Sequence, residues 1–364
     1  MSYSIKNKVI ETVLNVGRTS LLEILSSYSK EYRNQIEEGF LIDTNHLNGN
    51  PKQFYENKSN IKKIKMMNNV PNNNPRGIFQ VSISLNKVFS FFRDTNNVIK
   101  GFKHEFLFTL NSSLPVLKSS HLINLQNNNY QGAAQDGKFK IRIMDSYLKM
   151  FYVNPNLITN MYLTDIIASN KKIKFGYYPK TTLEISLTQG LTKIPIDLGK
   201  YASNNKIRRI VFSFQRNKID IDKNDDQDRQ TINRAIFDHL DLSHYQIKLM
   251  NQSYPSDKTF ELDFSGNRYV EAYDEYVNYF NTYNYLDSGI SKPLVSYVDY
   301  KNLYPIFCID CSNQDTSKDK HSTVDAFLNL KFSEPIPANS IAYVIVYYEQ
   351  ELELQMDGTY LSLI

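Results

Sequence analysis

Short segments in which apolar and polar residues alternate recur along most of this chain. Leu352, Leu354 and Met356 alternate with acidic and amide residues, and a similar period of two begins at Val81. This period places one face of an extended strand on a core and the other toward solvent or a neighbour. Many such segments separated by turn signals are typical of a β-sandwich or jelly roll. The pattern lies at 81–85, 106–110, 139–143, 183–187, 210–214, 245–249, 260–264, 327–332, 342–346 and 352–356.

Helical spacing is confined to a few places. Apolar residues broken by Gly17 predict one interrupted helix or two short helices between about 5 and 38. A second short helix is predicted over 157–169. The tyrosine-rich stretch 269–287 fits either a helix or a long aromatic loop.

Two polar regions predict how the chain divides into domains. Residues 43–75 are polar and contain three prolines, so we interpret 1–75 as a partly helical N-terminal arm. The most polar stretch contains five aspartates between 220 and 228, and we interpret 219–235 as a linker. The strand-like segments on either side then predict an all-β protein with one sandwich at 76–218 and another at 236–364.

The charge of the chain argues against a dedicated nucleic-acid-binding protein. The formal net charge is +4 over 364 residues, and such proteins normally carry a strong basic patch. Four lysines in the arm could contact nucleic acid inside a shell, although a solvated basic linker is the favoured interpretation. They are Lys58, Lys62, Lys63 and Lys65.

No pattern of catalytic or metal-binding residues emerges. The chain has no G-x-S-x-G elbow or glycine-rich phosphate loop, and its six histidines form no H-x-H or H-E-x-x-H pair. Cys308 and Cys311 stand alone as a C-x-x-C, where zinc needs four ligands, and in a strand they point to opposite faces. We therefore expect no enzyme, no cofactor and no metal site, and interpret both cysteines as small buried strand residues.

The cysteine count and the N-terminus bear on the compartment. Two cysteines provide no disulfide framework, which favours a reducing environment. The first residues lack the apolar core of a signal peptide, and no apolar run is long enough to span a membrane. We expect a non-secreted protein with no membrane span.

Tyrosine and phenylalanine are abundant, at 26 and 21 residues. The densest group lies in 269–287, where such residues are typical of interfaces, although filling of the core explains them equally well. The candidate subunit-interface residues are Tyr269, Tyr273, Tyr276, Tyr279, Phe280, Tyr283 and Tyr285.

The order and spacing of several segments resemble a known family. They run from VSISLNKVFSFFRDTNNVIKGFKHEFLFTLN at 81–111 through RRIVFSFQ at 208–215 and IFDHLDLSHYQIKLMNQSYP at 236–255. YKNLYPIFCIDCSNQ at 300–314 and FSEPIPANSIAYVIVYYEQELELQMDG at 332–358 complete the set. Together they resemble double jelly-roll capsid proteins of the Polinton and adintovirus type and, more loosely, the major capsid proteins of large DNA viruses. Residues 1–75 are outside this resemblance.

The resemblance implies two tandem eight-stranded jelly rolls in a structural capsid protein. It further implies a homotrimer that tiles an icosahedral shell, contacts neighbouring capsomers and minor capsid proteins, and is part of the virion. Three alternatives remain open: a glycan- or receptor-binding two-sandwich module, an enzyme on a jelly-roll scaffold, and a domesticated host copy that no longer builds virions.

Overall fold

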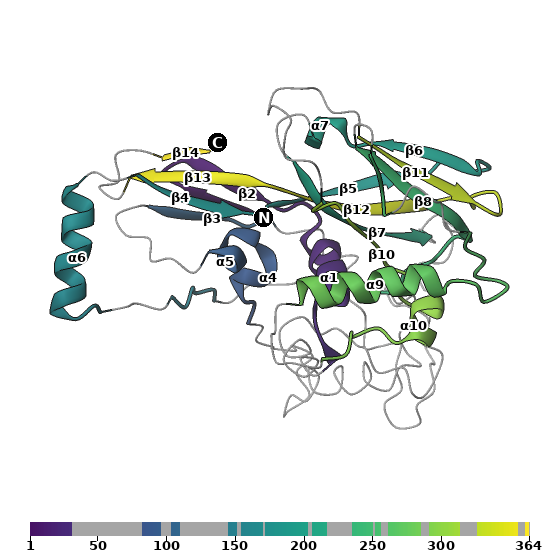
Figure 1. Ribbon diagram of the computed structural model, residues 1–364, viewed down its shortest axis with the longest axis horizontal. Coiled ribbons are helices and arrows are strands. Elements are labelled where there is room, and N and C mark those ends of the chain that lie inside the picture. Colours follow the sequence, from purple (N-terminus) through teal and green to yellow (C-terminus); the bar gives the residue numbers. More distant parts are fainter. Residues whose placement is uncertain are drawn as a thin grey trace, which may run out of the picture.

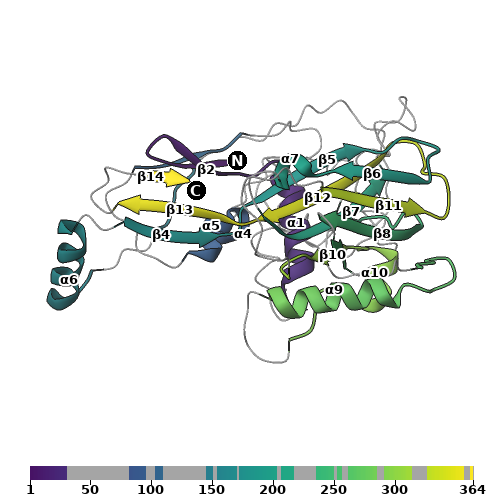
Figure 2. The ribbon, with the colours of Figure 1, turned by 45° about the horizontal axis from the view of Figure 1, so that its top comes forward.

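The computed structural model describes residues 1–30, 82–95, 103–109, 145–150, 154–169, 172–202, 206–216, 235–249, 252–255, 261–284, 291–313, 326–355 and 361–363. They form two lobes that lie side by side along the longest axis of the molecule (Figure 1). Strands between Lys180 and Tyr348 build the larger lobe. The smaller lobe combines strands from the N-terminal and C-terminal parts of the chain (Figure 2).

The larger lobe is an eight-stranded jelly roll. Its strands are β5 (Lys180–Ser186), β6 (Lys193–Asp197), β7 (Ile207–Arg216), β8 (Leu242–Leu249), β9 (Gln252–Tyr254), β10 (Phe307–Asp310), β11 (Ala326–Phe332) and β12 (Ser340–Tyr348). One antiparallel sheet has the order β10-β7-β12-β5 and the other β6-β11-β8-β9. Counted along the chain, the first strand lies beside the eighth and the second beside the seventh, as in a jelly roll.

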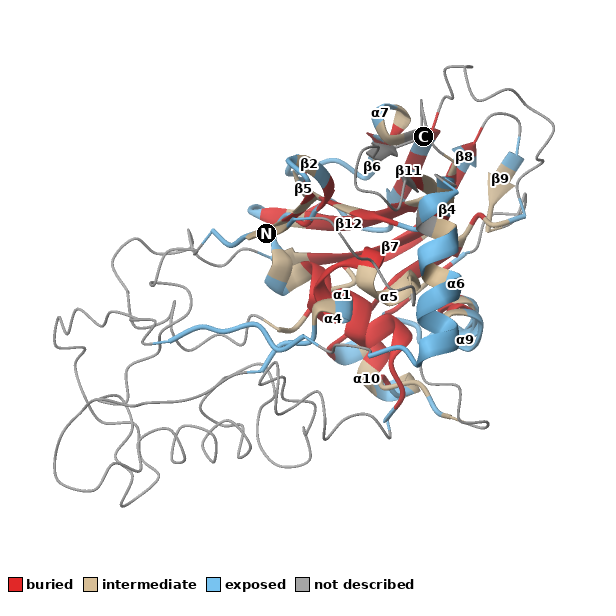
Figure 3. Cartoon of the chain, turned by 90° about the vertical axis from the view of Figure 1, so that its left-hand side faces the viewer, coloured by how far each residue is buried: buried red, intermediate tan, exposed pale blue. Residues whose placement is uncertain are grey.

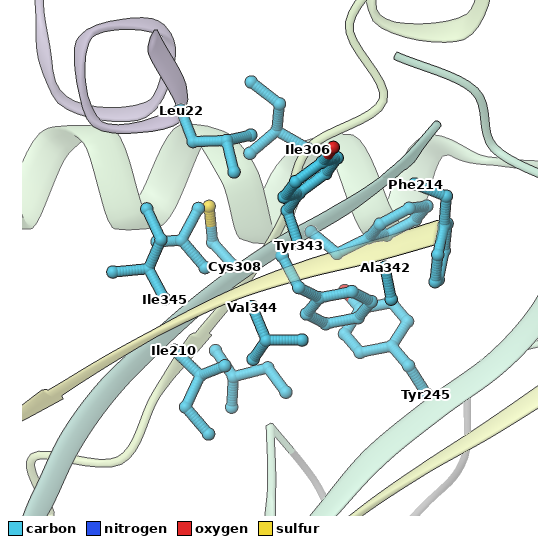
Figure 4. Close-up of a cluster of buried hydrophobic side chains, with 14 of the residues drawn as sticks. Leu22, Ile210, Phe214, Tyr245, Ile306, Cys308, Ala342, Tyr343, Val344 and Ile345 are labelled. Carbon is cyan, nitrogen blue, oxygen red and sulfur yellow. The ribbon is translucent and has the colours of Figure 1, made fainter. Parts of the chain in front are cut away.

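The burial of each strand follows from what covers its sheet. β11 alternates buried and exposed residues because only one of its faces meets the core. β12 is buried along almost its whole length, since both faces of its sheet are covered. Between the sheets, Phe212 packs against Tyr245 with ring centroids 5.6 Å apart. Figure 4 shows this core around Phe214, Tyr245 and Val344.

Helices α1 (Val16–Ser27) and α9 (Val270–Tyr283) cover the outer face of the β10-β7-β12-β5 sheet (Figures 1 and 2). Helix α10 (Tyr297–Asn302) packs beside α9, where the ring centroids of Tyr273 and Tyr297 are 5.1 Å apart. Ser296 caps the N-terminus of α10, where its hydroxyl accepts the Asp299 N–H at 3.2 Å. A further short helix, α7 (Gly199–Ala202), follows β6.

The smaller lobe has two three-stranded sheets, with strand orders β2-β1-β3 and β14-β13-β4. Tyr3, Phe91, Phe175 and Leu352 belong to its separate buried cluster. The strands are β1 (Ser2–Ile5), β2 (Lys8–Thr12), β3 (His104–Leu107), β4 (Lys172–Tyr177), β13 (Gln350–Gln355) and β14 (Leu361–Leu363). The helices are α4 (Leu85–Val88), α5 (Ser90–Asp94) and α6 (Leu157–Ala168), which stands at the far end of the molecule (Figure 1).

Two nearly continuous strands connect the lobes. Tyr178 and Pro179 alone separate β4 from β5, and Glu349 alone separates β12 from β13. Both strands keep their pairing across the junction, because β5 pairs with β12 and β4 pairs with β13. The lobes are thus joined through backbone hydrogen bonds on both sides of the junction.

The predicted division into domains is wrong. Strands β5 and β7 from the predicted first domain (76–218) share a sheet with β10 and β12 from the predicted second domain (236–364). The predicted linker at 219–235 therefore connects two strands of one jelly roll, and only residue 235 of it is described. A polar connection has the same composition whether it lies within a domain or between two, so local composition could not distinguish the cases.

The N-terminal prediction is wrong in part. Residues 2–12 form the β1–β2 hairpin, and the helix begins only at Val16. Residues 1–30 are no arm, because Tyr3, Leu22 and Leu25 are fully buried. Residues 31–75 lie outside the described part.

Most segment predictions agree with the structure. The helix predicted over 157–169 is confirmed as α6, and 269–287 contains the helix α9. The segments at 183–187, 210–214, 245–249, 327–332, 342–346 and 352–356 overlap β5, β7, β8, β11, β12 and β13. In contrast, 81–85 leads into α4, and 260–264 contributes only an isolated bridge at Asp263.

Candidate functional site

The tyrosine-rich helix α9 is part of the core. Its amphipathic spacing turns one face toward β10 and α1, and Tyr276, Tyr279 and Phe280 are at most 3% exposed. The Tyr276 hydroxyl donates to the Leu25 carbonyl at 2.8 Å, which joins α9 to α1. Burial raises the pKa of Tyr276 well above its ordinary value, so the hydroxyl stays protonated as a donor.

The predicted subunit interface is therefore wrong for most of its residues. Tyr269, Tyr276, Tyr279 and Phe280 are buried within their own chain, so they are closed to a neighbour. Tyr273 and Tyr283 are half-buried, and Tyr285 lies outside the described residues. A tyrosine has an apolar ring and a polar tip, so it suits a core position with a hydrogen-bond acceptor as well as an interface.

Tyr283 attaches the C-terminal end of α9 to the jelly roll. Its hydroxyl donates to Asp310 Oδ1 at 3.0 Å. Burial, with a contribution from the Asp310 charge, raises the pKa of Tyr283 to about 12. The Arg209 guanidinium lies 4.4 Å from the centroid of the Tyr283 ring and 4.1 Å from that of Tyr347. Arg209 therefore makes cation–π contacts with both Tyr283 of α9 and Tyr347 of β12, and β12 continues toward the junction between the lobes.

A buried ionic cluster lies at that junction. Glu23 on α1 accepts hydrogen bonds from Lys180 on β5 and Arg93 on α5, and from the Tyr347 hydroxyl of β12 at 3.3 Å. The side chains of Glu23, Lys180 and Arg93 are at most 6% exposed. Arg93 also pairs with Asp94 at 2.7 Å. We call Glu23, Arg93, Asp94, Lys180 and Tyr347 the junction cluster.

A second carboxyl group is buried beside the junction cluster. Glu11 on β2 accepts the Phe91 N–H at 3.0 Å through Oε2. Desolvation raises the pKa of Glu11, and the charges of Lys180 and Arg93 offset only part of this effect. Glu11 ties the N-terminal hairpin to α5 through this hydrogen bond.

The arrangement of the junction cluster is structural. Groups of charged side chains occur in active sites, but a catalytic group must reach its substrate. Glu23, Lys180 and Arg93 are closed to solvent and paired with one another. The cluster instead brings together two residues of α5 and one residue each of α1, β5 and β12. None of its residues was singled out from the sequence, because Glu23 and Lys180 are 157 positions apart.

The two cysteines are buried, as predicted from the strand-like segment that contains them. Cys308 on β10 and Cys311 directly after it are both free and buried. Burial raises the pKa of both thiols, which lowers their thiolate content and reactivity.

The structure does not bring the remaining candidate residues from the sequence together into a binding or catalytic site, as far as the described residues extend. Among these residues, no group of three or more His, Cys, Asp or Glu side chains is placed to hold a metal ion. His104 accepts or donates a hydrogen bond with the Tyr3 hydroxyl at 2.8 Å, within the smaller lobe. Lys58, Lys62, Lys63 and Lys65 lie outside the described part. No helix of the described part is long and apolar enough to cross a membrane.

Comparison with solved structures finds weak likenesses. One chain of the cryo-EM structure of the Sputnik virophage aligns at 13% identity with a TM-score of 0.30, covering 53% of this chain and 39% of that chain. The mavirus major capsid protein aligns at 11% identity with a TM-score of 0.26, covering 53% and 41%. The chain thus spans about two fifths of each. No curated protein matches the sequence.

The family of the chain is established independently of these alignments. A family model described as a double jelly roll-like domain matches residues 42–351. This range contains all eight strands of the jelly roll that the structure describes. The chain therefore belongs to the double jelly roll-like domain family.

Proposed function

We propose that this chain is a non-catalytic structural subunit of a viral or virus-derived capsid. The observation that carries the proposal is the membership in the double jelly roll-like domain family across residues 42–351. The ordered segments between 81 and 358, which resemble capsid proteins, support the same role. The buried junction cluster supports this role as well, because its ion pairs link α5 of the smaller lobe to α1 and β5 and are closed to solvent.

The assembly that best fits this role is a homotrimer in an icosahedral shell. A net charge of +4 on 364 residues lets many copies pack closely without strong mutual repulsion. Neighbouring trimers and minor capsid proteins are the proposed partners. The proposed location is the virion, with assembly inside the host cell and without secretion.

The test is purification of the full-length chain, followed by light scattering and electron microscopy. The expected particle has about three times the 42.4 kDa mass of the chain, or forms closed shells. A protein that stays monomeric at high concentration would contradict the capsid role. A monomer that binds to a glycan array would instead indicate an attachment module.

A further inference from the structure

The turn that leads into β8 has a strained backbone. It comprises residues 238–241, and we call it the His239 turn. Leu240 and Asp241 have φ angles of 49° and 51°, in the left-handed region that residues other than glycine rarely adopt. Two such residues in succession are unfavourable unless surrounding contacts hold them in place. At its start, Asp238 bridges to Phe214 of β7, a strand that Figure 3 shows as mostly buried.

Side chains of the His239 turn supply hydrogen bonds that hold this backbone. The Asp238 carboxylate accepts the Leu240 N–H at 2.9 Å. Nδ1 of His239 accepts the Asp241 N–H at 3.0 Å. The Asp241 carbonyl accepts both the N–H and the hydroxyl of Ser333, at 2.9 and 2.8 Å, which joins the turn to the end of β11. The imidazole of His239 is thus part of what fixes the left-handed conformation.

The hydrogen bond from Asp241 requires one protonation state of His239. A ring nitrogen accepts an N–H only through its lone pair, so Nδ1 carries no proton and the ring is neutral. Protonation places a hydrogen on Nδ1, where it would face the hydrogen of the Asp241 N–H. The Asp241 carboxylate, whose Oδ1 lies 3.4 Å from Nδ1, would then become the partner of the ring. Protonation therefore exchanges a backbone contact for a side-chain contact on the same residue.

The groups around the His239 ring favour the neutral form. Desolvation has the largest influence and lowers the pKa of His239, whereas Asp241 and Asp238 raise it. Arg216 from β7 and Lys301 from α10 lower it further. The resulting pKa lies below the ordinary histidine value of about 6.5, so the ring gains its proton in acid. The side chain is 23% exposed, which gives solvent protons access to it.

A stack of aromatic rings connects His239 to two helices. The imidazole lies 4.4 Å from the ring of Phe264, with 7° between their planes. Phe264 stacks on Tyr269, and Tyr269 on Tyr297, with ring centroids 5.4 and 4.5 Å apart. Tyr269 is the N-cap residue of α9, and Tyr297 is the first residue of α10. A movement of the His239 ring would therefore disturb the beginning of both helices.

We propose that the His239 turn is a pH-sensitive switch in the jelly roll. At neutral pH the unprotonated ring accepts the Asp241 N–H and holds the left-handed backbone. In acid the protonated ring pairs with the Asp241 carboxylate, the N–H loses its acceptor, and the connection into β8 loosens together with the stack on Phe264. The switch is a property of the single chain and is independent of the proposed capsid function.

A second histidine, His244, provides a contrast on β8. Its Nδ1 lies 3.0 Å from the Ser243 hydroxyl. A hydroxyl can either donate or accept, so this contact is compatible with both protonation states of the ring. The contact of His239 with a backbone N–H, which can only donate, lacks this tolerance. Of these two histidines, His239 alone should couple its protonation to the backbone.

The first experiment measures hydrogen exchange at the Asp241 amide in the full-length protein. Its exchange rate is compared with that of an unstructured peptide at the same pH. This protection should fall by about tenfold or more between about pH 7.5 and about pH 5, because one unit of pKa difference corresponds to a tenfold change. The Gly199 amide donates to the Asp197 carboxylate at 2.8 Å without a histidine, so its protection should stay constant.

The second experiment uses two variants to identify the titrating group. His239→Asn keeps an acceptor, because an asparagine oxygen commonly accepts the N–H two residues ahead, but it takes up no proton in this pH range. Protection of the Asp241 amide should then be the same at both pH values. His244→Asn removes the second histidine as the matched control, and this variant should keep the pH dependence of the wild type.

Two results would overturn the switch. One is a wild-type Asp241 amide with equal protection at both pH values, a measurement that needs no variant. The other is a loss of protection in acid that persists in His239→Asn, because it would arise from another group. Neither result bears on the capsid role, which is tested by the assembly of the wild type.

Discussion

Glu23 on α1 and Lys180 at the beginning of β5 form an ion pair whose side chains are at most 2% exposed. The pair joins the N-terminal segment to the jelly roll across 157 sequence positions. Arg93 from α5 completes it, so three separate parts of the chain share one carboxylate. A buried ion pair of this kind adds little net stability compared with apolar residues of the same size. Removing only one partner, however, strongly destabilises the fold, because the remaining charge stays buried without a counter-charge.

Removing one partner should therefore destabilise the protein strongly. Glu23→Gln leaves Lys180 and Arg93 without their shared carboxylate and should lower the free energy of unfolding by about 3–5 kcal/mol. Urea unfolding followed by circular dichroism measures this. The control, Glu105→Gln, breaks an exposed pair with Lys103 and should cost less than about 1 kcal/mol. Equal stability of Glu23→Gln and the wild type would contradict the role of the junction cluster.

The hydroxyl of Tyr276 should contribute measurably to stability. Tyr276→Phe removes the 2.8 Å hydrogen bond to the Leu25 carbonyl and the hydroxyl that accepts the Val295 N–H at 3.3 Å. The expected loss is about 1–2 kcal/mol in thermal or urea unfolding. Tyr162→Phe on the exposed face of α6 is the matched control and should change stability by less than about 0.5 kcal/mol. A smaller effect at Tyr276 than at Tyr162 would rule out the proposed link between α9 and α1.

Glu11 should make stability depend on pH. Its pKa is raised in the folded state, so the folded protein binds this proton more tightly than the unfolded chain does. The contribution is full below the ordinary carboxyl pKa and is lost as pH rises through the raised value. Glu11→Gln should remove it, so the variant gains stability over the wild type as pH increases toward neutrality. Parallel stability curves for the two proteins would show that Glu11 titrates alike in both states.

Cys308 and Cys311 should react slowly with thiol reagents in the native protein. Both are buried, and their raised pKa leaves little thiolate at neutral pH. A colorimetric thiol assay should detect two thiols only after unfolding. The variant Val298→Cys provides an exposed thiol as the positive control. Rapid reaction of both natural cysteines in the folded protein would argue for a redox role instead.

The two predicted domains should not fold separately. Fragment 1–218, which joins the predicted arm to the predicted first domain (76–218), and fragment 236–364 each lack strands that pair in the β10-β7-β12-β5 sheet, so each exposes unpaired strand edges and core residues. Expressed alone, both should be insoluble or lack cooperative unfolding by calorimetry. The full-length chain is the control. A fragment 236–364 with a sharp thermal transition of its own would restore the predicted boundary.

Local patterns in the sequence determined the type of most elements. The alternation of β11 was readable, because it depends only on which neighbouring residues share a face. The buried position of Cys308 followed from the same strand pattern. These features need no knowledge of which strand lies beside which.

The tertiary structure alone decided the pairing of elements and the environment of their side chains. The sequence could not reveal that β7 pairs with β12 across more than a hundred residues, or that Glu23 meets Lys180. It left the tyrosines of α9 open to either a core or an interface, because the same side chain suits both. Burial against α1 and β10 settled that choice, since core and surface are properties of the assembled layers and not of any one segment.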